Sequence, residues 1–293
     1  MKIIIYGLNF KPEIVGTGKY SGELADYLYK KGHNLKVITA PKYYPEWEIE
    51  RNNYYIEKNS LYKIFRCPLY VPKSPNGLKR ILHLFSFSIS SLPVLMMQLI
   101  WKPDCIILIA PTLLCAPNIF IFKLFSFKKI LTMIQIKDFE VEAAFNLGIL
   151  KGKIIKKILS KFEFLLINIF TIVGTISYQM INKLKTKGIK RKKVYYFPDW
   201  VDLNKIKQKN FYDVRNNIYR KKLNISSETI IIQYSGTMNR KQGFDFLLPI
   251  IDSFKDSKNV LWLFGGEGPT KKEFMKKTKK IKNLIFLPFQ EEK

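Results

Sequence analysis

The chain has 293 residues, which is enough for about two domains, and its hydrophobic fraction of 47% is typical of a globular protein with a sizeable core. Its 50 basic residues against 23 acidic ones give a net charge of +27, which favours anionic partners such as lipid headgroups, sugar phosphates or nucleic acid. Lysines occur in nearly every segment, so a general bias toward Lys and Ile can also account for much of this surplus. No motif of interleaved basic and aromatic residues supports nucleic acid, and we expect no nucleic-acid partner.

The cysteines and histidines predict neither a disulfide framework nor a metal site. Cys67, Cys105 and Cys115 have no paired spacing, which fits a reducing compartment. His33 and His83 are the only histidines, and no carboxylate cluster supplements them, so we expect no metal and no cofactor. The apolar run at the N-terminus is typical of a strand rather than a signal peptide, and we expect a cytoplasmic protein.

Strand and helix patterns alternate from the first residues onward. Apolar runs predict buried strands at residues 2–7, 33–40, 62–70, 104–111 and 128–138. Helical patterns occupy residues 21–32, Leu78–Trp101 and Ile154–Ile169. This alternation predicts an α/β fold with a parallel sheet covered on both faces.

The loop after the first strand reads "VGTGKYSGE" and ends in Gly16, Thr17 and Gly18, before the helix. A dinucleotide fingerprint is excluded because the glycines are one residue too far apart and the second strand ends without a ribose-binding acid. A nicotinamide oxidoreductase is therefore disfavoured. A nucleotide P-loop is excluded as well, because Glu13 occupies the first glycine position and Tyr20 replaces the hydroxyl for magnesium. Two interpretations remain: an anion site of backbone N–H groups at a helix start, and a flexible turn.

Two segments are candidates for contact with a membrane. Residues 81–101 contain no Asp, Glu, Lys or Arg and reach spanning length, but four serines, His83, Gln98 and Pro93 weaken a transmembrane assignment. A helix dipping into the bilayer interface, an ordinary core helix and a true span all stay open. The segment "KGKIIKKILSKFEFLLINIF" interleaves five lysines with apolar residues, and either anionic headgroups or water can meet its basic edge.

The alternation pauses near "VYYFPDWVDLNKI", and we place the domain boundary at Pro198, giving domains of residues 1–197 and 198–293. The second domain has predicted strands at 229–236, 259–265 and 283–289, and helices at 243–255 and 270–280, the first kinked or broken by Pro249. Three strands and two helices are half of an ordinary doubly wound domain. We therefore expect an incomplete second domain and a truncated chain.

Two strand-to-helix turns of the second domain are rich in glycine. Gly236 belongs to "YSGTMNRKQGFD", and Gly265, Gly266 and Gly268 belong to "FGGEGP". Ligands of parallel sheets bind at such carboxyl ends of strands, where glycines let backbone amides face a pyrophosphate. Arg240 and Lys241 would supply the countercharge.

The segments "GLNFKPEIVGTGKYSGELADYLYKKGHNLKVITAPKYYPEW", "RCPLYVPKSPNGLKRILHLFSFSISS", "WKPD", "FPDWVD" and "YSGTMNRKQGFD" resemble the retaining glycosyltransferases of family four, and among them the colanic acid biosynthesis type. The resemblance implies the GT-B architecture, in which two Rossmann-like doubly wound domains bind the acceptor (N-terminal) and a nucleotide-sugar (C-terminal). It implies donor-binding roles for Gly16, Thr17, Gly18, Ser235, Gly236, Arg240, Lys241, Gly265, Gly266, Gly268 and, next to Phe289, Gln290.

This chain departs from the family at two places. Many relatives have His-Asp where this chain has Lys137-Asp138, so the histidine is not carried over; Asp138 and Glu140 are candidate acceptor-binding or catalytic residues, and helix capping is the alternative for Asp138. The family's acidic motif for the transferred sugar and ribose would lie beyond Lys293. We therefore expect the polypeptide as given to be inactive or very weak alone.

The resemblance implies sugar transfer with retention from a nucleotide-diphosphate sugar. No D-x-D pair occurs, so Lys, Arg and helix-end amides would stabilise the leaving diphosphate without metal. A sugar on polyprenyl diphosphate is the expected acceptor, in exopolysaccharide, capsule or O-antigen biosynthesis, because the apolar and basic helices would bring the protein to the inner membrane face. The alternative is a truncated, non-catalytic protein that binds the membrane surface.

Overall fold

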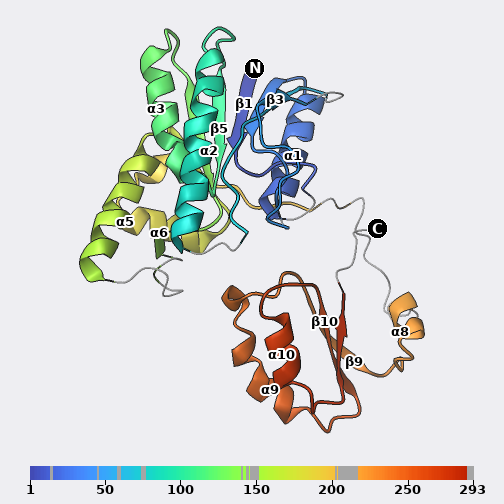
Figure 1. Cartoon of the computed structure of the whole chain (residues 1–293). Coiled ribbons are helices and arrows are strands. Elements are labelled where there is room, and N and C mark those ends of the chain that lie inside the picture. The colour runs from blue at the N-terminus through green and yellow to red at the C-terminus, as the bar shows by residue number, and fades with distance from the viewer. Residues whose placement is uncertain are drawn as a thin grey trace. The chain divides into compact units, whose positions relative to one another are not determined.

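The computed structural model describes residues 1–13, 16–44, 46–57, 61–73, 77–139, 141–142, 145, 152–201, 203 and 217–288. The chain divides into two compact units, Met1–Val201 and Asp202–Lys293 (Figure 1).

The first unit is built on an eight-stranded sheet in the order β3-β4-β2-β1-β5-β6-β7-β8. Neighbouring strands are parallel except β3, which is antiparallel to β4. Strand β5 is buried at every position, as expected for a parallel sheet covered on both faces. The strands are β1 (Lys2–Gly7), β2 (Asn34–Thr39), β3 (Tyr55–Ile56), β4 (Lys63–Arg66), β5 (Cys105–Ile109), β6 (Leu131–Ile136), β7 (Ile172–Thr175) and β8 (Val194–Tyr196).

Helices cover the two faces of this sheet unequally. Helix α1 (Gly16–Lys30) packs Leu24 and Ala25 against one face. The other face carries a larger core with residues from four helices: α2 (Gly77–Met97), α3 (Ala116–Phe125), α5 (Lys153–Asn168) and α6 (Tyr178–Thr186) (Figure 1). Short 3-10 turns lie at Leu113–Cys115 (η1) and Arg191–Lys193 (η2).

Among the described helices, α2 alone is long and apolar enough to cross a membrane by length and composition, and 28% of its most apolar window is buried.

The second unit contains a parallel three-stranded sheet in the order β11-β10-β9. Its core joins Phe264 of the central strand to Phe244, Ile251 and Phe274 from the helical segments. The elements are α8 (Ile218–Lys222), β9 (Ile230–Ser235), η3 (Arg240–Gln242), η4 (Phe244–Phe246), α9 (Leu248–Ser253), β10 (Val260–Gly265), α10 (Lys271–Lys277) and β11 (Leu284–Leu287).

The predicted α/β class with parallel sheets is confirmed, with local corrections. The first helix begins at Gly16 rather than after the glycines. Strands β3, β7 and β8 were not predicted from the sequence. The helix predicted at 243–255, kinked or broken by Pro249, is broken into η4 and α9. Pro249 lies in the first turn of α9, where its missing N–H has no intrahelical acceptor to lose.

Candidate functional site

Gly16 begins helix α1 at the carboxyl edge of the first sheet. Its φ of +58° lies in the left-handed region, and no described atom lies within 4 Å of where its Cβ would be. Such a conformation favours glycine, and the open surroundings leave room for a ligand at the helix start. Thr17 and Gly18 complete this first turn.

Gly18 makes a close contact within the protein. A Cβ there would lie 2.6 Å from Cβ and 2.7 Å from Oε2 of Glu13, which is too close for a side chain. Glycine at this position therefore admits the Glu13 side chain, a packing role that the spacing of the glycines did not reveal. Its donor-binding role stays a prediction.

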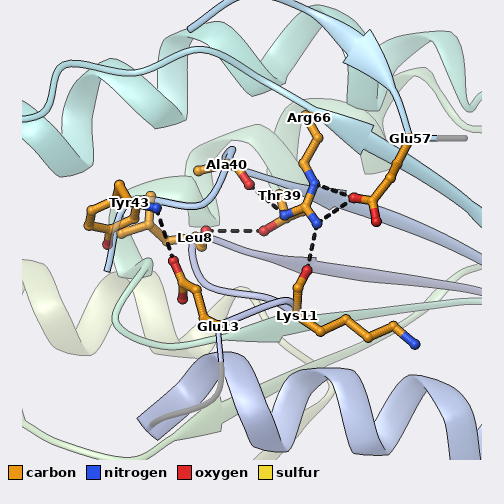
Figure 2. A network of polar contacts seen from close by, with 8 residues as sticks. All are labelled: Leu8, Lys11, Glu13, Thr39, Ala40, Tyr43, Glu57 and Arg66. Carbon is orange, nitrogen blue, oxygen red and sulfur yellow. Dashed lines mark hydrogen bonds and ion pairs between the residues drawn. The ribbon is translucent and has the colours of Figure 1, made fainter. Parts of the chain in front are cut away.

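Glu13 is buried and accepts three hydrogen bonds, of which Figure 2 shows the one from Tyr43. Asn9 Nδ2 donates to Oε2 at 2.9 Å, and the amides of Tyr43 and Tyr44 donate to Oε1 at 3.4 and 3.3 Å. Burial raises the pKa of Glu13 above its ordinary value, and these hydrogen bonds partly oppose the shift. Glu13 thus ties the loop after β1 to the loop after β2.

Arg66 makes a second connection between the loops after β1 and β2. It is 2% exposed and donates through Nε and Nη2 to Glu57 Oε2 at 2.8 and 2.5 Å. Its remaining hydrogen bonds reach the carbonyl oxygens of Ala40 at 2.8 Å and Lys11 at 2.5 Å, as Figure 2 shows. The chain leading to Gly16 is therefore held by buried polar contacts with the loop after β2 and with β4.

Lys137 follows β6 and pairs with the "FPDW" segment. Its Nζ lies 2.5 Å from Asp199 Oδ1 and 4.3 Å from the ring centre of Tyr20 in α1. Trp200 donates through Nε1 to Glu23 of α1 at 2.8 Å. Sequence reasoning noted the lysine in place of a histidine but missed its acidic partner, which lies 62 residues later.

The two candidate acids of the "KDFE" stretch differ in what the structure describes. Asp138 is exposed at the carboxyl end of β6, and Glu140 lies outside the described residues. Among the described residues, no group of three or more His, Cys, Asp or Glu side chains could hold a metal ion.

The glycine turns of the second unit pack backbone against backbone. A Cβ on Gly266 would lie 1.9 Å from the carbonyl oxygen of Gly236, and one on Gly268 would lie 2.1 Å from that of Met238. The amide of Gly236 donates to Gly265 at 3.0 Å, and the amide of Gly266 donates to Leu287 at 3.4 Å. These two amides therefore bind carbonyl oxygens within the unit, and the glycines allow the two turns to meet.

The remaining candidate donor residues lie at the same carboxyl edge of the second sheet. Ser235 ends β9 opposite Gly265 in register, and exposed Arg240 begins η3. The backbone of Lys241 belongs to η3, but its side chain, like Phe289 and Gln290, lies outside the described residues. Each unit thus gathers its predicted glycines at one edge of its own sheet.

Comparison with known proteins identifies the fold. No family model matches the chain. It resembles the solved structures of HepE from Anabaena in complex with UDP-glucose (TM-score 0.61, 14% identity, 99% of this chain and 70% of that one) and of WaaG, a glycosyltransferase involved in lipopolysaccharide biosynthesis (TM-score 0.63, 11% identity, 98% and 70%). At such identities the likeness shows the fold, which is GT-B.

The sequence comparison is closer. The chain is 37% identical, over 99% of its length and 72% of the relative's, to the Escherichia coli protein named "Putative colanic acid biosynthesis glycosyl transferase WcaI". This identity spans both units and confirms the predicted resemblance to a glycosyltransferase of polysaccharide biosynthesis. The chain belongs to the glycosyltransferase family of WcaI.

Proposed function

We propose that this glycosyltransferase moves a sugar from a nucleotide-diphosphate sugar to a sugar carried on polyprenyl diphosphate, with retention, as a member of family four. The reaction would take place at the inner face of the cell membrane, in exopolysaccharide, capsule or O-antigen biosynthesis. The observation that carries the proposal is the 37% identity with WcaI over 99% of the chain. The UDP-glucose complex of HepE, a protein of the same fold, supports a nucleotide-sugar donor.

The proposed chemistry depends on stabilising the leaving diphosphate. Arg240 and Lys241 follow the Gly236 turn directly in sequence and supply two positive charges next to the carboxyl end of β9. Charge-assisted hydrogen bonds from such side chains are shorter and stronger than neutral ones, and they stabilise negative charge without a metal ion. The open position at Gly16 is a second place where backbone can approach an anion.

On the acceptor side we assign a binding or catalytic role to Asp138 and Glu140. Asp138 is exposed at the carboxyl edge of the parallel sheet, where ligands of such sheets bind. The N-terminal domain (1–197) would then bind the acceptor, and the C-terminal domain (198–293) the donor.

Calorimetric titration of the chain with UDP- and GDP-sugars tests the donor assignment. We expect Lys241→Ala to weaken nucleotide-sugar binding at least about tenfold, because it removes a charged hydrogen bond to the diphosphate. Lys282→Ala, at an exposed lysine of the same unit, is the matched control and should bind like the unaltered chain. Equal affinities of both variants would refute the role of Lys241.

Binding of lipid vesicles without any binding of nucleotide-sugar would favour the non-catalytic membrane-binding protein instead.

A further inference from the structure

The core side of helix α2 carries polar side chains beside the apolar Leu84, Phe87 and Leu95. Ser88 donates to the carbonyl oxygen of Leu114 at 2.8 Å, and the hydroxyls of Ser91 and Tyr6 share a hydrogen bond of 2.5 Å. His83 and Gln98 are buried on the same side, and Lys36 of β2 donates to Gln98 at 2.8 Å. Four of the polar residues that weakened the transmembrane assignment, His83, Ser88, Ser91 and Gln98, are therefore buried within the first unit.

The opposite, exposed side of α2 is apolar. Six apolar residues on this side lie three, four or eight positions apart, as on one face of a helix, and each is 51–88% exposed: Leu78, Leu82, Phe85, Ile89, Met97 and, just after the helix, Ile100. At about 1.5 Å per residue the part of the stripe within α2, from Leu78 to Met97, is roughly 29 Å long. A helix at the surface of a soluble domain normally presents charged and polar side chains to water, so an apolar outer side is unusual.

Helices α3 and α5 continue this exposed apolar surface. Helix α3 contacts both α2 and α5, so the three form one layer over the sheet (Figure 1). The exposed apolar residues of this part are Phe120, Leu124, Phe125 and Phe127 from α3 and the turn after it, and Ile154, Ile155, Ile158, Phe162 and Leu165 from α5. We call the exposed apolar residues of α2, α3, α5 and their following turns the docking face.

The charges on the three helices are almost all positive. They carry seven basic residues, Lys79, Arg80, Lys123, Lys153, Lys156, Lys157 and Lys161, and one carboxylate. That carboxylate, Glu163, is 3% exposed and pairs with Lys187 at 2.5 Å, so it does not offset the surface charge. An apolar surface with a basic fringe is complementary to a bilayer that has anionic headgroups.

We propose that the docking face lies flat on an anionic lipid bilayer. The buried hydrogen bonds of Ser88, Ser91 and Gln98 keep α2 in the sheet's helical layer, so α2 lies in the interface instead of crossing the membrane. Apolar side chains from all three helices enter the headgroup region, and the lysines of α5 meet the phosphates. This inference deepens the proposed function, because it rests on the proposed location at the inner face of the membrane.

Vesicle flotation of the full chain, without donor or acceptor, tests this docking. We expect binding to vesicles of equal parts phosphatidylcholine and phosphatidylglycerol, and much weaker binding to phosphatidylcholine alone. Phe85→Asp on α2 and Ile158→Asp on α5 should each reduce binding at least about tenfold, because each removes an exposed apolar side chain that the bilayer would bury and adds a negative charge. The matched control is Tyr27→Asp, at a side chain 58% exposed on α1, over the opposite face of the sheet.

A second pair of variants tests the charge. Lys156→Glu with Lys157→Glu should reduce binding to the anionic vesicles more than about tenfold, while Lys30→Glu with Lys31→Glu, at the end of α1 and just after it, should not. All of these positions are exposed, and thermal unfolding of each variant checks that it is folded.

Three outcomes would overturn the proposal. The first is binding by Phe85→Asp and Ile158→Asp equal to that of the unaltered chain, and the second is an equal loss in the α1 controls. The third is a dimer in sedimentation velocity that Phe85→Asp dissociates, without vesicle binding, since a second copy would then cover the face. Nucleotide-sugar titration of the same samples separates this failure from that of the proposed function, because vesicle binding and donor binding are measured independently.

Discussion

Gly18 lies so close to Glu13 that the size of one residue decides how the other packs. We expect Gly18→Ala to lower the free energy of unfolding by about 1–3 kcal/mol, because its Cβ would lie 2.6 Å from the Glu13 side chain and force a shift. Gly265→Ala is the control, since its Cβ would meet its nearest atoms at ordinary contact distances of 3.7 and 3.9 Å. Urea unfolding measures both. Equal stability of Gly18→Ala and the unaltered chain would show that Glu13 can rearrange freely.

The buried carboxyl of Glu13 also predicts a dependence on pH. Burial raises its pKa, so the folded protein keeps this proton to a higher pH than the unfolded chain does. Its contribution to stability is therefore present at low pH and is lost as pH rises from the ordinary glutamate pKa through the raised one. We expect the unfolding free energy of Glu13→Gln to fall less over that interval than that of the unaltered chain. Denaturant unfolding at a series of pH values measures the two curves, and parallel curves would contradict the prediction.

At the scale of elements, Arg66 joins the loops after β1 and β2 to β4. Arg66→Met would leave the carbonyl oxygens of Lys11 and Ala40 without their donor and Glu57 without its partner. We expect a loss of roughly 3 kcal/mol of unfolding free energy, limited by the partial exposure of Glu57. Arg66→Lys should lower the unfolding free energy less than Arg66→Met does, since lysine keeps the positive charge although it lacks the planar guanidinium group.

Arg51→Met is the matched control for this prediction. Arg51 is exposed, with Asn53 and the Tyr55 ring as its partners, so the change should stay within about 0.5 kcal/mol. Thermal or urea unfolding of the three variants ranks them. If Arg66→Met were as stable as Arg51→Met, the buried network would not hold the loops.

The sequence predicted those elements whose pattern is local. Strands β1, β5 and β6 are apolar runs that the sequence pattern predicts. Strands β7 and β8 are short, and Tyr195 and Tyr196 of β8 are exposed, so no apolar run in the sequence indicated these two strands. The contacts that shape the candidate site were not predictable in this way. Glu13 lies 30 residues from Tyr43, and Gly268 is glycine because the Met238 carbonyl passes beside it. Only the folded chain brings such residues together.

The whole molecule carries a net charge of +27. In the first unit the lysines are spread over both faces of the sheet, whereas the broad exposed apolar surface lies on one of them. These lysines include Lys30 at the end of α1 and Lys31 just after it, whereas the layer of α2, α3 and α5 combines lysines with the apolar surface. The sequence showed that an apolar segment with basic neighbours exists. Which side of the helix faces outward depended on hydrogen bonds to distant residues such as Tyr6.

Because the apolar surface is confined to one layer, the dependence of binding on salt concentration should distinguish non-specific contact with DNA from docking on an anionic bilayer. Binding to DNA by surface lysines depends on counterion release and should fall by about a thousandfold or more between about 50 and 200 mM salt if six or more phosphates are contacted. Binding to anionic vesicles should fall much less over the same range, because burial of Phe85, Ile158 and their neighbours does not depend on ionic strength. Parallel titrations of the chain with duplex DNA and with phosphatidylglycerol vesicles measure both slopes. Equal slopes would mean that charge alone holds the protein at a membrane, and the apolar layer would then need another partner.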